Sequence, residues 1–417
     1  MKKLAAVFLT LLFASTASAQ VISNPTQNSR MVGLGVQNWQ IEDDFNIFIN
    51  PAQLSNYKNN VYGELGAYTA SNPAIGGGAG SANPGGIGTG SQWGGMNMDV
   101  SYGGWGVYLG RPYAGPLNAA STGAAAFVAT PLTAPVNNRF DLFYATHGMP
   151  LGFYLSYASR ATETKAGAAK VTDEASEINL GVGGLIMNNM LDVALNLGMP
   201  SMEDNDGTTK VQGDAGINIA LLGRLHTGMG GNAKLLTTLQ ILMGDASLKA
   251  TGGAKLEQTA NTIRLDTALN SKPNPSTLLV AGIGIASTST EGKLKPGGAK
   301  STTSNLTIPV NVAVEHQTFK PVKTRIGLSS AIYNTTECKD SGGIAVCTPG
   351  PPPVANTKVT TVADGTATMS MGFGWAVADN LMLDAVINQD VLFSGTYVVS
   401  GVSETLSTML SATYRMK

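Results

Sequence analysis

The feature that most constrains this 417-residue chain is a two-residue period of apolar side chains along most of its length. The period is clearest before the tight turn at Asp379-Asn380, where every second residue is large and apolar: Met369, Met371, Phe373, Trp375 and Val377. It resumes after the turn, from Leu381 to Ile387. A period of two is the spacing of a strand with two unlike faces. Two such runs joined by a tight turn predict a β-hairpin.

The same pattern predicts about 16 strands, with 14 within the error of the count. The expected strands are Asn60–Thr69, Gly94–Tyr102, Gly104–Gly110, Asn138–Thr146, Pro150–Ser159, Ala175–Met187, Asn189–Met199, Gly213–Leu225, Gly230–Met243, Gln258–Leu269, Pro275–Ala286, Thr303–Thr318, Pro321–Asn334, Val362–Val377, Asn380–Gln389 and Glu404–Met416.

The connections between these strands alternate between short and long. Short links fall at positions such as Gly103, Asn188 and Ala378–Asp379. The long polar connections are Ala70–Trp93, Arg111–Asn137, Arg160–Glu174, Pro200–Gln212, Gly244–Glu257, Ser287–Ser301, Thr335–Thr361 and Val391–Ser403. Outer-membrane barrels have tight periplasmic turns and long outside loops, whereas a soluble sandwich has no reason to sort its loops by length. We therefore expect an all-β fold, a transmembrane antiparallel up-and-down β-barrel over residues 60–417.

The N-terminus and the composition favour an exported membrane protein. Residues 1–19 read as a signal peptide, because Lys2-Lys3 precede a short apolar run and Ala17-Ser18-Ala19 fits a cleavage site. The alternative, an anchor helix, would need about 18 apolar residues, and no such run follows. Only 13% of residues are charged, against about a quarter in soluble proteins, which a large lipid-facing surface explains. We expect the outer membrane of a Gram-negative-type bacterium, with outer-membrane lipid as a partner. The net charge of −1 gives no reason to expect nucleic acid.

Residues 20–59 precede the first strand and do not alternate. An acidic cluster at Glu42-Asp43-Asp44 is followed by apolar residues and Asn50-Pro51-Ala52. This order resembles the outer-membrane long-chain fatty-acid transporter family, and the resemblance implies that the segment folds into the barrel as a plug. The chain has Val32-Gly33-Leu34-Gly35-Val36 where that family carries a Gly/Ala-rich run, which leaves the plug's shape open. The simpler interpretation is a short helix that starts at Pro51 after a cap at Asn50.

The last strand resembles the C-terminal signal by which the barrel-assembly machinery recognises outer-membrane barrels. Leu410, Ala412, Tyr414 and Met416 alternate with polar residues. The chain departs from that signal because it ends at Met416-Lys417 rather than on an aromatic residue. An ordinary amphipathic strand is the alternative.

Taking the more apolar face of each strand as lipid-facing assigns the residues of the lumen. Lipid-facing Lys or Arg near the midplane costs about 2–4 kcal/mol, so charges are expected inside. The expected lumen residues are Glu64, Asp99, Arg139, Asp141, Glu177, Asp192, Arg224, Lys234, Arg264, Asp266, Glu315, Lys323, Arg325 and Asp384. They predict a wet, polar interior. Either they pair with one another and solvate the wall, or some, such as Arg325 and Arg264, line a selective constriction.

The remaining motifs carry little chemistry. Cys338 and Cys347 flank a short segment of an exported chain, which predicts a disulfide. The acidic segment at residues 203–207 contains part of a calcium loop but lacks the distant Glu, so a solvated turn is preferred. None of the three histidines has partners at metal-ligand spacing. We expect no metal, no cofactor and, since no nucleophile motif stands out, no enzymatic activity.

These observations favour a passive outer-membrane channel for a small-molecule permeant. If residues 20–59 fill the bore, the permeant is a hydrophobic or amphipathic compound, as the family resemblance implies. The first alternative is a general or weakly selective diffusion porin, which the mixed lumen charges favour. The second is a binding or assembly scaffold that transports nothing.

Overall fold

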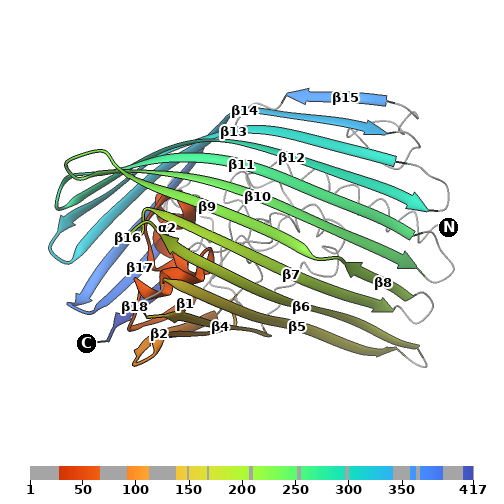
Figure 1. Cartoon of the computed structure of the whole chain (residues 1–417), viewed down its shortest axis with the longest axis horizontal. Coiled ribbons are helices and arrows are strands. Elements are labelled where there is room, and N and C mark those ends of the chain that lie inside the picture. Colours follow the sequence, from red (N-terminus) through yellow and green to blue (C-terminus); the bar gives the residue numbers. More distant parts are fainter. Residues whose placement is uncertain are drawn as a thin grey trace, which may run out of the picture.

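The structure is a computed structural model of the chain, and the description covers residues 28–65, 92–111, 138–147, 150–166, 169–205, 210–250, 255–295, 300–340, 357–362, 367–387 and 407–416. The predicted signal peptide, residues 1–19, and Cys347 lie outside these residues. Within them the fold is nearly all β, and one antiparallel sheet curls into a barrel (Figure 1).

The strands follow one another around the sheet in chain order. They are β1 (Asn60–Leu65), β2 (Gln92–Val100), β3 (Gly103–Leu109), β4 (Asn138–Thr146), β5 (Leu151–Ala166), β6 (Ala169–Ile186), β7 (Leu191–Asn205), β8 (Lys210–Ala215), β9 (Asn218–Gly228), β10 (Ala233–Ala250), β11 (Lys255–Asn274), β12 (Thr277–Lys295), β13 (Lys300–Phe319), β14 (Val322–Asp340), β15 (Thr357–Val362), β16 (Thr368–Ala378), β17 (Leu381–Ile387) and β18 (Ser407–Arg415).

The eighteen strand elements make a closed barrel of sixteen strands. β8 and β9 both pair with β7 and with β10, so together they form one interrupted strand. β15 and β16 both pair with β14 and form another. The ring closes because β1 pairs with β2 on one side and with β18 on the other. The predicted fold class and strand number are confirmed.

Several predicted long loops are wrong, because the strands continue through them. Arg160–Glu174, Pro200–Gln212, Gly244–Glu257 and Ser287–Ser301 lie mostly within hairpins that extend β5–β8 and β10–β13. These extensions are rich in Thr, which favours strands. They lack the apolar alternation because a bilayer needs only about 9–11 residues of a strand, and beyond it both faces meet water. The result is a wall that is longer over β5–β14 than over β1–β4 and β16–β18 (Figure 1).

Exposure alternates along the strands with the predicted period. In β11, Ile263 and Leu265 are 56% and 45% exposed, whereas Arg264 between them is 2% exposed. In β16, Phe373 and Trp375 are 39% and 47% exposed and continue the outward apolar surface. β16 and β17 pair through the tight turn as predicted, with Ala378 opposite Leu381.

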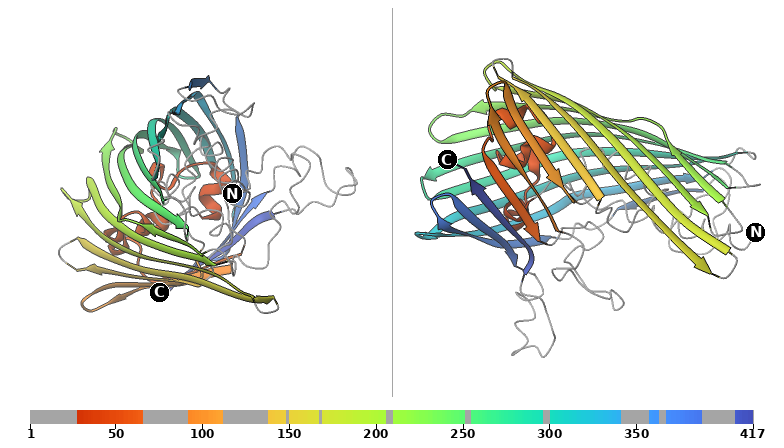
Figure 2. Two further views of the ribbon diagram at one scale, coloured as in Figure 1. Left: turned by 90° about the vertical axis from the view of Figure 1, so that its right-hand side faces the viewer. Right: turned by 90° about the horizontal axis from the view of Figure 1, so that it is seen from below.

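Residues 28–59, called the inner segment below, lie inside the barrel (Figure 2). They form helix α2 (Ser29–Leu34) and the 3₁₀ turns η2 (Asn38–Gln40), η3 (Asp44–Phe48) and η4 (Pro51–Ser55). The segment touches strands all around the ring: α2 contacts β13, β14 and β16–β18, η2 contacts β10 and β11, and η4 contacts β3–β6. It sits at the short-turn end, since Ala52 lies against Gly152 at the start of β5. None of the helices among the described residues is long and apolar enough to cross a membrane.

Candidate functional site

The candidate site is the contact between the inner segment and the barrel wall. Its local structure comes from side-chain caps that satisfy the exposed N–H groups of very short helices. The Asn28 side chain accepts from Met31 N at the start of α2, and Gly35 ends that helix in the left-handed region at φ 62°. Asp43 caps η3, and Asn50 caps η4 with Pro51 in its first turn. The helix start expected at Asn50-Pro51 is therefore present, and all three residues of Asn50-Pro51-Ala52 are buried inside the barrel.

One side of the inner segment is apolar and faces strands β1–β5. Phe45 packs edge-on against Tyr62 and Trp93 with ring centroids 4.7 Å and 5.5 Å apart. Phe48 packs against Tyr108 and Phe143 at 5.0 Å and 5.3 Å. We call this contact the aromatic seam. The expectation of a polar interior throughout is wrong at this end of the bore, because an aromatic side chain from each of five neighbouring strands, down to Tyr154 of β5, joins the same buried cluster.

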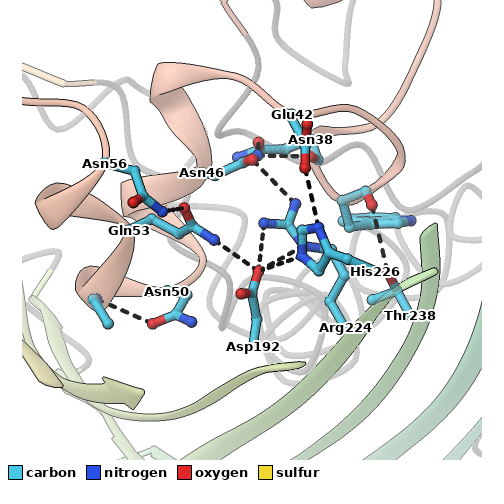
Figure 3. A network of polar contacts seen from close by, with 12 residues as sticks. Asn38, Glu42, Asn46, Asn50, Gln53, Asn56, Asp192, Arg224, His226 and Thr238 are labelled. Atoms are coloured by element: carbon cyan, nitrogen blue, oxygen red, sulfur yellow. Dashed lines mark hydrogen bonds and ion pairs between the residues drawn. The ribbon is translucent and has the colours of Figure 1, made fainter. Parts of the chain in front are cut away.

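The inner segment also makes polar contacts with the wall, centred on Asp192 of β7 (Figure 3). Asp192 Oδ2 accepts hydrogen bonds from Arg224 Nε at 2.8 Å and from Gln53 Nε2 at 2.9 Å. Arg224 Nη1 also donates to Asn46 Oδ1 at 3.1 Å. Both wall residues are fully buried, and a buried charge is tolerated only when its partners are present. Two inner-segment amides thus complete a charged site of the wall.

Glu42 makes a second attachment, closer to solvent. Its carboxylate accepts a hydrogen bond from Lys234 Nζ at 3.0 Å. It also lies 3.1 Å from His226 Nδ1, and His226 Nε2 lies 3.1 Å from Asp192 (Figure 3). The hydrogen bond to His226, with help from Lys234, lowers the pKa of Glu42 from 4.5 to about 2. The Glu42 side chain is 40% exposed, so this ion pair contributes at most about 1 kcal/mol.

Arg30 makes the third attachment, on the other wall. Its guanidinium bridges Asp43 of the inner segment at 2.6 Å and Glu315 of β13 at 2.9 Å. Partial burial disfavours its charged form, but these two carboxylates raise the pKa of Arg30 well above its usual range. Glu315 also binds Arg325 at 2.7 Å, and Arg325 lies 2.6 Å from Asp384. The attachment therefore continues into a chain of ion pairs across β13, β14 and β17.

Two further arginines stack on aromatic rings of the inner segment. Arg111 lies 4.3 Å over Phe48 and binds Asp141 at 2.7 Å. Asp141 also binds Arg139 at 3.0 Å. Arg264, which is paired with Asp266, lies 4.7 Å over Trp39. Stacking of a buried guanidinium on an aromatic face is worth up to about 2 kcal/mol, so these arginines contact the inner segment rather than an open channel.

The remaining predicted lumen residues lie in two places. Glu64 is buried and accepts a hydrogen bond from Trp93 at 2.9 Å, and Glu177 is also buried. Asp99 and Lys323 lie nearer the short-turn rim, where Asp99 pairs with Lys58 and His147 and Lys323 lies 3.9 Å from Glu315. Most of the expected lumen charges are thus brought together in paired networks.

Wall glycines allow the inner segment to approach so closely. A Cβ at Gly327 of β14 would fall under 3.0 Å from the Leu34 carbonyl oxygen, and one at Gly152 of β5 would collide with the backbone of Pro51 and Ala52. Glycine permits this backbone-to-backbone contact because it has no side chain. These positions hold the segment by shape, independently of charge.

The other sequence-based expectations lie outside this site. Cys338 of β14 is disulfide-bonded, and Cys347 lies outside the described residues. Glu203 to Asn205 belong to β7, while residues 206 and 207 of the acidic segment are not described. Within the described ranges no three His, Cys, Asp or Glu side chains are grouped so as to hold a metal ion.

Sequence reasoning missed several residues of the site, namely Arg30, Glu42, Asn46, Gln53, Arg111 and His226. A signal was present for two of them, because Arg30 is an isolated charge and Glu42 begins the acidic cluster of a segment that is otherwise mostly neutral. The sequence pattern places Arg111 in a long loop, but Arg111 lies only two residues beyond the end of β3.

Comparisons with known proteins give likenesses to outer-membrane barrels. No protein-family model matches the chain, and no curated protein matches it in sequence. The CymD monoaromatic hydrocarbon channel is 9% identical over 93% of this chain and 97% of its own length, with a TM-score of 0.38. The alcaligin outer-membrane receptor FauA from Bordetella pertussis is 7% identical over 85% and 75%, with a TM-score of 0.37.

The siderophore receptor PiuA from Acinetobacter baumannii is 8% identical over 60% of this chain and 46% of its own, with a TM-score of 0.40. This chain spans about half the length of the first receptors it matches. The solved structures named here are thus a siderophore receptor, an outer-membrane receptor and a hydrocarbon channel.

Proposed function

We propose that this chain is a passive outer-membrane transporter of hydrophobic or amphipathic small molecules, with the inner segment as a movable plug. The observation that carries the proposal is that the inner segment contacts the wall in two ways, through aromatic rings and through buried polar groups. Its aromatic seam faces β1–β5, and its polar attachments face β7, β9, β10 and β13.

The energetics of the aromatic seam favour an apolar permeant. Burying a phenylalanine side chain is worth about 1.5–3 kcal/mol, so exposing Phe45 and Phe48 to water would cost about 3–6 kcal/mol in total. An apolar molecule that enters the seam replaces the lost contacts and removes most of this cost. Ions and sugars cannot replace these contacts, so the plug excludes them.

The porin alternative requires charged side chains that line an open bore. These side chains instead contact the inner segment or pair with one another. Asp192, Arg224 and Glu315 contact the inner segment, and Arg325 and Asp384 pair behind Glu315. The position of Asn50-Pro51-Ala52 inside the barrel also supports the resemblance to the long-chain fatty-acid transporter family.

The test is solute uptake into proteoliposomes that carry the intact chain. We expect radiolabelled laurate to enter much faster than into empty vesicles, and sucrose not to enter. Phe48→Ser, which makes the seam polar, should admit sucrose. Phe319→Ser, the same change at a residue that is 66% exposed at the short turn between β13 and β14, should not admit sucrose.

Each of the other outcomes rejects the proposal in a different way. Uptake of sucrose by the intact chain at the rate of laurate would support the general porin. Uptake of neither solute by the intact chain or by Phe48→Ser would support a scaffold that does not transport.

A further inference from the structure

The long wall carries an unusual set of lysines on its outward face. Ile263 of β11 and Ile285 of β12 point outward, since they are 56% and 45% exposed. Every second residue along each strand, counted from these two, therefore points outward as well. Their pairing continues without a register shift from these residues to the ends of the hairpin. The outward charged residues of β11–β14 beyond the apolar belt, which we call the outer lysine cluster, are Lys255, Glu257, Glu291, Lys293, Lys295, Lys300, Glu337 and Lys339.

Within this cluster, lysines face lysines directly across neighbouring strands. Lys255 of β11 is opposite Lys295 of β12, and Lys293 of β12 is opposite Lys300 of β13. Like charges directly opposite one another are destabilising unless a counter-charge lies between them. Five lysines are set against three glutamates, so the cluster has an excess of positive charge.

The glutamates compensate only part of the cluster. Glu257 binds both Lys255 at 3.1 Å and Lys295 at 2.7 Å, and Glu291 binds Lys300 at 2.8 Å. Lys293 is exposed and has no ion-pair partner within the described ranges. Lys293, which faces Lys300 directly, thus offers an ammonium group to an external anion.

The height of the cluster matches the outer headgroup layer. The outward apolar residues of β12 begin near Leu279, and a bilayer takes up about ten residues of a tilted strand. The hydrocarbon edge then falls near Ser289, and Lys293 lies only a few residues beyond it. The cluster is at the end opposite the short turns, which is the outside in an outer membrane.

We propose that the outer lysine cluster binds the phosphate groups of a phosphorylated glycolipid in the outer leaflet. The apolar residues below it, including Ile263, Ile285 and Ile332, would contact the acyl chains of the same molecule, since Ile332 is 64% exposed. Lysine stems are long enough to lie along an apolar surface while the ammonium group meets phosphate. The partner thus supplies an anion to Lys293 and balances the excess of positive charge in the cluster.

The experiment measures binding of bis-phosphorylated lipid A to the purified barrel in detergent. The double substitution Lys293→Gln/Lys300→Gln should weaken binding by about tenfold or more, since each lysine near an anionic lipid surface contributes about a factor of five. The matched control Lys272→Gln/Lys320→Gln removes the same charge at the short-turn end and should bind like the unmodified chain. All four lysines are exposed, and a heat-modifiability gel checks that each barrel is folded.

A further substitution should strengthen lipid binding, so the test has an expected change in each direction. Glu257→Gln removes the carboxylate that competes for Lys255 and Lys295, so it should tighten lipid A binding several-fold. Dephosphorylated lipid A should bind the unmodified chain no better than it binds the double variant. Equal binding of phosphorylated lipid A to the double variant and its control would overturn the proposal. Full competition by millimolar inorganic phosphate would also overturn it, because the cluster would then be a free-phosphate site.

Discussion

At the scale of single residues, two kinds of contact hold the inner segment in the barrel, one by shape and one by charge. The shape contacts are glycines such as Gly327, where a wall strand meets the backbone of α2. The charge contacts are Glu42 and Arg30, which reach different strands of the wall. The two kinds can be tested separately, because an added side-chain methyl group disturbs the shape contacts and a change of pH disturbs the charge contacts.

Gly327→Ala should displace the inner segment without preventing barrel formation. Its Cβ would overlap the Leu34 carbonyl, and backbone cannot move aside as a flexible side chain can. We expect a higher ion leak through reconstituted protein. Gly223→Ala is the control, because a Cβ there meets nothing within 4 Å, and it should leak no more than the unmodified chain. Equal leak in both variants would mean that α2 is not seated against β14.

The pH dependence follows from Glu42, whose pKa falls from 4.5 to about 2 in the folded chain. A lowered carboxyl pKa stabilises the attached state above pH 4.5, and that stabilisation is lost as the pH falls through about 2. The Glu42 attachment should therefore persist from pH 7 to pH 5.

Ion leak measured against pH checks this prediction. Leak through the unmodified chain should rise between about pH 4.5 and pH 2, and Glu42→Gln should leak equally at all these values because it has no carboxylate to protonate. A rise that is complete by pH 5, or an identical rise in Glu42→Gln, would assign the effect to another group.

At the scale of elements, the hairpin β16–β17 shows what the sequence could predict. The alternation from Met369 to Val377 gave the strand, its outward face and its turn, because lipid outside and a filled bore inside impose opposite polarity on alternate residues. The upper hairpins of β10–β13 could not be found this way, since above the bilayer both faces are polar. The contacts of the inner segment could not be predicted for a second reason: pairs such as Gln53 and Asp192 join residues far apart in the chain.

The face assignment of this hairpin makes a sharp prediction. Phe373→Arg should block membrane assembly, because Phe373 is 39% exposed on the outward face and a lipid-facing Arg costs about 2–4 kcal/mol. Asp384→Asn should still assemble, because Arg325 keeps Glu315 as a partner at 2.7 Å. The measurement is the yield of the heat-modifiable folded form. Normal assembly of Phe373→Arg would show that the face is assigned wrongly.

At the scale of the whole molecule, the inner segment packs against the barrel wall at the short-turn end. The sixteen strands close on themselves through β1 and β18, so the wall does not need the inner segment to complete its sheet. The inner segment in turn contacts nearly the full circumference near the short turns. The central claim is therefore that removing the inner segment opens an intact barrel.

Conductance in planar bilayers tests this claim most directly. The intact chain should show little steady ion current, and a chain lacking residues 21–59 should insert as a folded barrel and conduct steadily. Steady current through the intact chain at the same level as through the shortened one would contradict the account, as would a shortened chain that folds and remains closed.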